Sequence, residues 1–189
     1  MNKLFSDNVY IYPTDTVWGI GASIFSERGT NLVRKIKGSS REKPLSVLFN
    51  TFDTFNKFVE LPNNLCKYNF EKIFTMEVTL GFPKQWFKIA IPEWIISDSS
   101  IVATRLLSQS SLKNMIEKEG GAITTTSLNK FNKDAIVDFD VAKKFYLKEK
   151  LKENDLYFIE DKVVLPSGRA SGMFFFDEDH RLKVIREGK

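Results

Sequence analysis

Short apolar runs of strand length recur along the chain and are separated by polar turns. Runs of this kind, rich in Val, Ile, Phe, Tyr and Thr, are typical of buried β-strands. The first of them stops at Pro13, which cannot donate a hydrogen bond to a neighbouring strand. The predicted strands are Val9–Tyr12, Leu45–Phe49, Val78–Phe82, Ile101–Arg105, Ala122–Thr126, Tyr157–Glu160, Met173–Phe176 and Leu182–Arg186.

Between these runs, apolar residues recur at helical spacing. In the first such segment Leu32, Val33 and Ile36 share one face, as expected for an amphipathic helix. The predicted helices are Glu27–Ile36, Phe52–Val59, Asn63–Phe74, a segment around Leu112–Ile116 and a segment around Val141–Tyr146. Strands and helices interleave irregularly, so the sequence predicts an α/β (α+β) fold with a twisted, mixed β-sheet flanked by helices.

Two of these helices carry finer predictions. Asn63–Phe74 is expected to turn Leu65, Tyr68 and Ile73 inward. The helix around Leu112–Ile116 is expected to begin at a capping hydroxyl, either Ser110 or Ser111. It should end at Gly120 and Gly121, because glycine commonly closes a helix.

Length and composition place residues 1–189 in a single globular domain, with 42% hydrophobic residues and a net charge of +4. The basic balance favours anionic partners such as nucleotides or RNA. A codon bias that enriches lysine would explain it equally well, and the two interpretations stay open. The single Cys66, the absence of a long apolar run and the short polar N-terminus predict a cytoplasmic protein without a membrane span.

The familiar catalytic sets are missing from the sequence. The one histidine, His180, lies in a polar turn, and Cys66 is expected to fill space in the core. No second His or Cys stands near either, so no metal site is predicted. The chain also contains neither a Walker A loop nor a G-x-G-x-x-G motif.

Polar segments stand instead at the ends of the predicted strands. Hydroxyls and amides in such places orient a small polar ligand, and several separate cations suit a polyphosphate. Each segment also has an ordinary structural interpretation, as a turn, a solvated loop or β-sheet material. The segments are Thr14–Thr16, Lys37–Lys43, Arg105, Thr124–Asn129, Ser167–Gly172 and Arg186.

Their order along the chain carries more information than any one of them. Tyr12–Gly21 reads Y-P-T-D-T-V-W-G-I-G, and Lys37–Leu45 reads K-G-S-S-R-E-K-P-L. At this spacing the two segments resemble the first two motifs of the YrdC/TsaC family, the L-threonylcarbamoyladenylate synthases. Weaker similarities follow in family order along nearly the whole chain, at Val102–Arg105, Thr126–Asn129, Ala170–Met173 and Val184–Gly188.

The resemblance implies an ATP-dependent nucleotidyltransferase on a single YrdC-like domain. Such an enzyme makes threonylcarbamoyl-AMP from L-threonine, bicarbonate and ATP and releases pyrophosphate, in the first step of t6A modification of tRNA. The threonine amine captures CO₂ as a carbamate, whose carboxylate attacks the α-phosphate. Mg²⁺ would arrive with the nucleotide. The implied partners are tRNA, either indirectly or through direct RNA binding, and a t6A transferase complex.

Site roles also follow from the resemblance. Thr16, Arg105, Thr125 and Ser171 are expected to bind L-threonine, with the Arg105 guanidinium on its carboxylate. Lys37 is the expected catalytic residue, near both the carbamate and the phosphates. The expected ATP-binding residues are Lys37, Arg41, Lys43, Ser127, Asn129 and Arg186.

The sequence departs from the family pattern in three places. Ser39 stands where the family has arginine, and Arg41 lies two residues further on. The family's W-P-G-P-x-T element corresponds to Phe74–Thr79, with the threonine alone retained, and its P-S-T corresponds to Ala170–Gly172. Two alternatives therefore stand beside the synthase: an RNA-binding protein on the same fold without adenylation activity, and a relative that adenylates another substrate.

Overall fold

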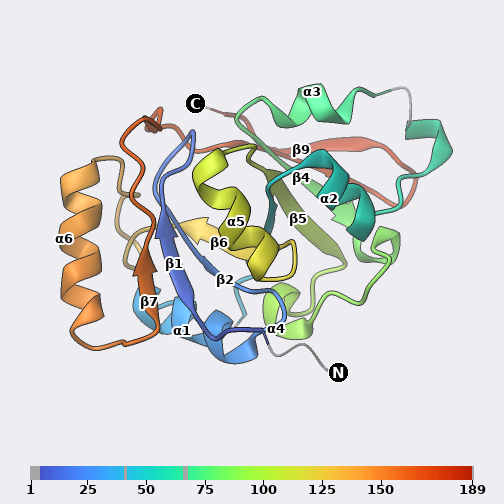
Figure 1. Cartoon of the computed structure of the whole chain (residues 1–189). Coiled ribbons are helices and arrows are strands. Elements are labelled where there is room, and N and C mark those ends of the chain that lie inside the picture. Colours follow the sequence, from blue (N-terminus) through green and yellow to red (C-terminus); the bar gives the residue numbers. More distant parts are fainter. Residues whose placement is uncertain (1–4, 41, 66–67, 189) are drawn as a thin grey trace.

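The computed structural model describes residues 5–40, 42–65 and 68–188. Within these ranges nine strands form one mixed sheet in the order β7-β1-β2-β6-β3-β5-β4-β8-β9, as Figure 1 shows. The strands are β1 (Val9–Tyr12), β2 (Gly19–Ala22), β3 (Ser46–Phe49), β4 (Val78–Pro83), β5 (Ile101–Leu106), β6 (Ile123–Ser127), β7 (Leu156–Phe158), β8 (Gly172–Phe176) and β9 (Leu182–Arg186). The predicted fold class is confirmed.

Helices cover both faces of this sheet. In Figure 1, α5 lies across the front of the sheet, α6 stands beside β7, and α1 and α4 lie below. The helices are α1 (Glu27–Lys37), α2 (Phe52–Phe58), α3 (Phe70–Phe74), α4 (Glu93–Ile96), α5 (Ser110–Lys118) and α6 (Phe139–Lys150), with 3₁₀ turns at Asn63–Leu65 and Lys84–Trp86. No helix in the described ranges is long and apolar enough to cross a membrane.

The alternation of side chains along β1 explains why helices are needed on both sides. Val9 and Ile11 point to one face, where they pack with side chains of α1 and α6. Tyr10 and Tyr12 point to the other face and pack under α5. All four side chains are at most 7% exposed, so β1 lies in the interior of the sheet with both faces covered.

The other half of the sheet is held by aromatic rings. Phe55 of α2 is fully buried and lies 5.2–5.6 Å, between ring centroids, from Phe49, Phe74 and Phe82. Phe82 in turn stacks on Phe176 at 5.6 Å, which ties β4 to β8. Ring pairs at these separations add to the stabilisation that their burial already provides.

Two glycines of the first motif are required by close packing. A Cβ atom at Gly21 would lie 1.8 Å from the carbonyl oxygen of Thr124, and one at Gly19 would lie 2.8 Å from the ring of Tyr12. Real Cβ atoms do not approach backbone that closely. The glycines therefore let β2 lie against β6 and the Tyr12 ring, and the motif has a structural reason for them.

The predicted elements are largely confirmed, with β1 and β9 at their predicted bounds. One helix prediction was wrong: Asn63–Phe74 is a 3₁₀ turn followed by the separate α3, which starts because Asn69 caps the amide of Lys72 at 3.0 Å. Phe70 and Phe74 face inward there, whereas Tyr68 is 38% exposed. Cys66 lies outside the described residues.

Three smaller differences concern element ends and short elements. The residue before α5 is Gln109, without a side-chain cap bond, rather than Ser110 or Ser111. Strand β2 was not predicted, because its Gly-Ile-Gly-Ala sequence is poor in β-branched residues. The short α4 was missed as well, since four residues are too few to show a helical period.

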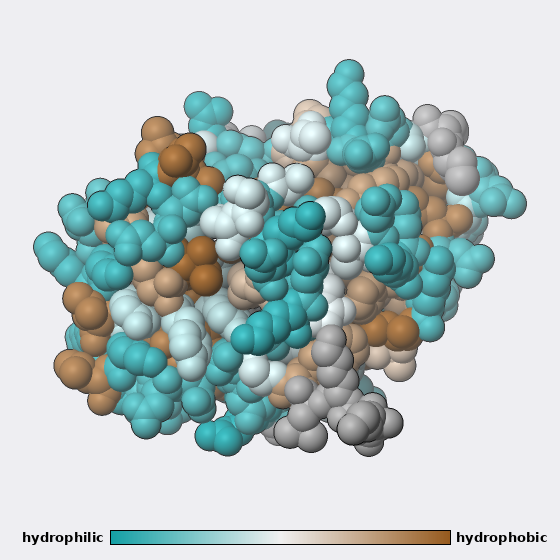
Figure 2. All heavy atoms as spheres, viewed as in Figure 1, coloured by the Kyte–Doolittle hydropathy of each residue, from teal (hydrophilic) through white to brown (hydrophobic). Residues whose placement is uncertain are grey.

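Exposed apolar side chains are scattered over the surface seen in Figure 2 and do not gather in one patch. Leu147 and Leu151, on and just after α6, are examples at 53% and 90% exposure, and lysines lie next to them in the sequence. Single exposed apolar residues are usual on soluble domains. They give no reason to look for the functional site on this surface.

The aromatic core gives a first testable prediction. Phe55→Ala should lower the free energy of unfolding by about 3–5 kcal/mol, because the ring is fully buried and its neighbours cannot close the cavity. Phe131→Ala makes the same chemical change at a ring that is 51% exposed, and should cost less than about 1 kcal/mol. Urea denaturation followed by circular dichroism measures both. Equal losses would contradict the assigned core.

Candidate active site

A cavity of about 540 Å³ opens where the β1–β2 turn meets the ends of several central strands. Its wall is made of hydroxyl groups, small residues and a few cations, which suits a small polar ligand. The residues that line it come from separate parts of the chain: Thr14, Thr16–Gly19, Lys43, Pro44, Ser46, Thr79, Arg105, Thr125–Ser127, Asp134, Ala135, Gly168, Ala170, Ser171, Met173 and Arg186.

The turn between β1 and β2 forms one wall and is held rigidly. The Thr14 hydroxyl donates to the carbonyl of Val17 at 2.6 Å and lies 3.0 Å from the hydroxyl of Thr16. From the other side, the amides of Ser167 and Gly168 donate to the carbonyls of Asp15 and Thr16, each at 2.8 Å. The Thr16 hydroxyl is thus fixed at the cavity wall although its residue is only 4% exposed.

Arg105, near the end of β5, brings a buried positive charge to the cavity. Its residue is 7% exposed, and its Nη2 donates to Oδ1 of Asp15 in an ion pair. Its Nε is buried and finds no acceptor among the described residues. A buried donor without a partner is costly. The guanidinium lines the cavity and is only partly satisfied by its protein partners.

Hydroxyl pairs continue the wall on both sides of Arg105. The hydroxyls of Thr79 and Ser171 lie 2.9 Å apart, and the guanidinium of Arg186 donates to the carbonyl of Ser171 through Nε at 3.1 Å and Nη2 at 2.8 Å. Opposite, Tyr12 donates to the hydroxyl of Thr125 at 2.7 Å. Burial raises the pKa of Tyr12 above its usual value, so this phenol keeps its proton and acts as a donor.

Lys37 ends α1 and lies behind the cavity rather than on its surface. Its Nζ donates to Oδ1 of Asn129 at 2.6 Å, to the carbonyl of Asn129 at 3.4 Å and to the carbonyl of Ser127. All three acceptors are uncharged. Burial, and then the nearby charge of Lys43, lower the pKa of Lys37 from 10.5 to about 8. Lys37 therefore ties α1 to the end of β6 while holding a weakly compensated charge.

Most of the predicted site residues are brought together. Seven of them line the cavity: Thr16, Lys43, Arg105, Thr125, Ser127, Ser171 and Arg186. Lys37 and Asn129 form the layer directly behind Ser127, and Arg41 lies outside the described residues. No site role was predicted for Asp15, Thr79 or Asp134. Asp15 and Thr79 lie inside motif segments, which is a signal for a site residue, whereas the sequence around Asp134 is that of an ordinary polar loop.

The described chain offers no ready-made metal site. Across residues 5–40, 42–65 and 68–188, no three His, Cys, Asp or Glu side chains come together as ligands. Asp134 lines the cavity, and the carboxylate of Asp15 is engaged by Arg105. A divalent ion here would have to depend on ligand oxygens for most of its coordination, as Mg²⁺ does when it travels with a nucleotide.

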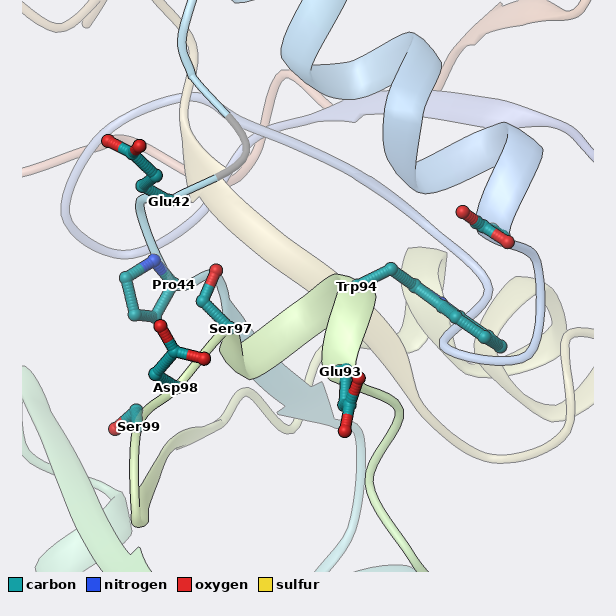
Figure 3. Close-up of a pocket in the computed structure, with 8 residues that line it drawn as sticks. Glu42, Pro44, Glu93, Trp94, Ser97, Asp98 and Ser99 are labelled. Carbon is teal, nitrogen blue, oxygen red and sulfur yellow. The ribbon is translucent and has the colours of Figure 1, made fainter.

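A second hollow, of about 460 Å³, lies between α4 and the loop before β3. It is acidic, with Glu27, Glu42, Glu93 and Asp98 on its wall. Figure 3 shows that the carboxylates of Glu42, Glu93 and Asp98 point in different directions and do not converge on one position. None of the described residues on its wall is a cation that could bind a phosphate or a carboxylate ligand, so the first cavity is the candidate site.

Comparison with known proteins identifies the family of this chain. The family model for Sua5/YciO/YrdC proteins, which carries the description "Telomere recombination", matches residues 2–188. A threonylcarbamoyl-AMP synthase of Haemophilus influenzae (strain PittEE) is 28% identical over 131 residues, which cover 68% of this chain and 69% of the relative.

Solved structures share the fold at lower identity. The Sua5 protein of P. abyssi, crystallised with L-threonine, superposes with a TM-score of 0.77 at 19% identity over 96% of this chain. The present chain spans about half of that protein, 51% of its length. YciO of E. coli superposes with a TM-score of 0.70 at 16% identity, covering 96% of this chain and 83% of its own.

The environment of Lys37 predicts an unusual titration. Because its folded pKa of about 8 lies below the unfolded value of 10.5, the unfolded chain binds this proton more tightly between these pH values. The contribution of Lys37 to the free energy of unfolding should therefore rise with pH from about 8 to 10.5. NMR of the lysine ε-methylene groups should show one midpoint near 8.

Lys43→Gln provides the control for this titration. It removes the second cause of the low pKa, and the Lys37 midpoint should move upward while remaining below that of the unfolded chain. If the Lys37 midpoint in the unaltered protein coincides with that of the unfolded chain, the buried placement of its ammonium group is wrong.

Proposed function

Because this chain belongs to the Sua5/YciO/YrdC family, we propose that it is an ATP-dependent synthase that converts L-threonine, bicarbonate and ATP into threonylcarbamoyl-AMP and pyrophosphate. The relatives that resemble it in sequence are threonylcarbamoyl-AMP synthases at 24–28% identity. The observation that carries the proposal is the buried Arg105, whose guanidinium lines a cavity walled by hydroxyl groups and is only partly satisfied by its partners.

The amino-acid end of the cavity fits L-threonine. The planar fork of Arg105 can hold the carboxylate by two parallel hydrogen bonds. Thr16, Thr125 and Ser171 supply hydroxyl partners around it, and all three line the cavity. The family member from P. abyssi was crystallised with L-threonine, which supports the assignment of this end to the amino acid.

The nucleotide end lies where Lys43, Ser127 and Arg186 meet the cavity, with Lys37 and Asn129 behind Ser127. Lysine and arginine groups from separate elements can surround a triphosphate from several sides and reduce the repulsion between it and an incoming anion. Bound Mg²⁺ would add charge neutralisation on the phosphates. The residues present fit this role, since they supply cations rather than a metal cage.

The reaction asks little acid–base chemistry of the protein. Bicarbonate takes up a proton and loses water to give CO₂. The neutral amine of threonine attacks the carbon of CO₂ and releases a proton to solvent, which gives a carbamate. A carbamate oxygen then attacks the α-phosphorus, and the bond to the β-phosphate oxygen breaks with release of pyrophosphate. The protein must hold two anions in line and screen their repulsion. That requirement explains how a cavity without histidine or cysteine can be catalytic.

The wider role follows from the product. Threonylcarbamoyl-AMP is consumed in the t6A modification of tRNA, so we place tRNA and a transferase complex downstream of this protein and predict that it acts in the cytoplasm. The alternatives are an RNA-binding protein without adenylation activity and a synthase for another substrate. These alternatives become outcomes of the experiment.

The decisive assay mixes the protein with ATP, L-threonine and bicarbonate and measures pyrophosphate release together with the carbamoyl-adenylate by mass spectrometry. Product that requires all three substrates is the expected result. Pyrophosphate that forms equally well without threonine would indicate another acceptor. No turnover over a range of pH and Mg²⁺ concentration, combined with tight and salt-dependent RNA binding, would favour the RNA-binding alternative.

Lys37→Ala tests the proposed catalytic lysine. Its turnover should fall at least about 100-fold, as when one group that stabilises transition-state charge is removed from other enzymes. Far-UV circular dichroism should stay unchanged. Lys35→Ala is the matched control on the same helix, because the Lys35 side chain is 71% exposed and pairs with Glu153 at the surface. Equal activity in both variants would show that Lys37 is not part of the machinery.

A further inference from the structure

The ion pair between Asp15 and Arg105 places an anion directly beside the proposed carboxylate site. Arg105 comes from β5 and Asp15 from the β1–β2 turn, 90 positions apart in the chain. The Arg105 side chain is 9% exposed and that of Asp15 is 32% exposed. The pair therefore lies at a boundary, with its cation buried and its anion still reachable from solvent.

The ion pair leaves part of each partner unused. One nitrogen of Arg105, Nη2, contacts one oxygen of Asp15, and the buried Nε has no acceptor in the described part of the chain. A guanidinium binds a carboxylate most strongly when two adjacent N–H groups are used together. The pair as it stands is thus a partial match, in which Asp15 satisfies only part of the hydrogen-bonding capacity of Arg105.

An α-amino acid is the ligand whose charges complement this pair. Its carboxylate and its ammonium group sit on the same carbon atom, so a cationic donor for the first and an anionic acceptor for the second must be neighbours. Arg105 supplies the first and Asp15 the second. The turn that carries Asp15 is fixed, because its carbonyl and that of Thr16 accept the amides of Ser167 and Gly168.

We infer that Asp15 is the specificity-determining residue that recognises the substrate ammonium group, and that it serves as the counter-ion of Arg105 while the site is empty. When the amino acid enters, its carboxylate pairs with the guanidinium of Arg105 and its ammonium group pairs with the carboxylate of Asp15. The exchange replaces one ion pair by two. This inference rests on the proposed amino-acid site and adds the reason why that site prefers an amino acid to a simple hydroxy acid.

Two ligands separate this role from a merely structural one. L-Threonine and 3-hydroxybutanoate share the carboxylate and the hydroxyl, but 3-hydroxybutanoate lacks the amine. Asp15→Asn should weaken L-threonine binding by about 10-fold or more, as expected for the loss of one charged hydrogen-bonding partner. The same variant should bind 3-hydroxybutanoate more tightly than the unaltered protein does, because Arg105 no longer has a competing anion.

Isothermal titration calorimetry on the full chain measures both dissociation constants. Asp15→Glu is the conservative variant and should restore the preference for L-threonine, since it keeps the negative charge. Asp155→Asn is the matched control, because it removes a carboxylate that pairs with Arg28 at the surface and does not line the cavity, and it should leave the ratio of the two affinities unchanged. Circular dichroism confirms that each variant is folded.

Opposite changes for the two ligands support the inference. If Asp15→Asn weakens both ligands equally, Asp15 only positions Arg105 and the inference is overturned. If it changes neither, or if the unaltered protein binds no amino acid, the inference is also overturned. The proposed function has its own readout, the carbamoyl-adenylate product. A protein that makes this product while Asp15→Asn keeps its preference would retain the function and lose the inference.

Discussion

Strand β6 joins the two halves of the sheet, and the candidate site depends on that join. On one side β6 pairs with β2, which belongs with β1 and β7, and on the other side it pairs with β3, which belongs with the remaining four strands. Thr16 comes from the first half, whereas Arg105 and Ser171 come from the second. The close approach of Gly21 to the carbonyl of Thr124 is what lets the two halves meet, and therefore what brings the cavity wall together.

The positive charges around the cavity have different kinds of partner, either a carboxylate or uncharged oxygens. The kind of partner decides how much positive charge is left to attract an anionic ligand. Arg105 has a carboxylate partner, so its charge is largely balanced in the empty site. Lys37 and Arg186 have backbone and amide oxygens as partners, which satisfy hydrogen bonds without cancelling charge. The proposed nucleotide end thus keeps an excess of positive charge. The proposed amino-acid end is close to neutral, as would suit a zwitterion.

The sequence predicted the outlines of this arrangement because its signals are local. An apolar run between turn residues predicts a strand such as Val9–Tyr12, whatever position that strand takes in the sheet. The break before α3 was not predicted, because the apolar residues of Asn63–Phe74 keep a helical spacing across it. The Asn69 side chain caps a new helix there instead of continuing the old one. The family resemblance selected most of the cavity residues. The pairing of Asp15 with Arg105 could not be predicted, since nothing local links positions so far apart in the chain.

The contacts between the β1–β2 turn and residues 167–168 have a consequence for how the protein is made. The turn lies near the start of the chain, yet the amides that hold it come from Ser167 and Gly168. The parallel neighbour of β1 is β7, which is also synthesised much later. Strands β8 and β9, which bring Ser171 and Arg186, come later still. During synthesis the first motif therefore leaves the ribosome long before its supports exist. The cavity is among the last parts of the molecule to be completed, because the final quarter of the chain supplies Ser171, Arg186 and the amides that hold the β1–β2 turn.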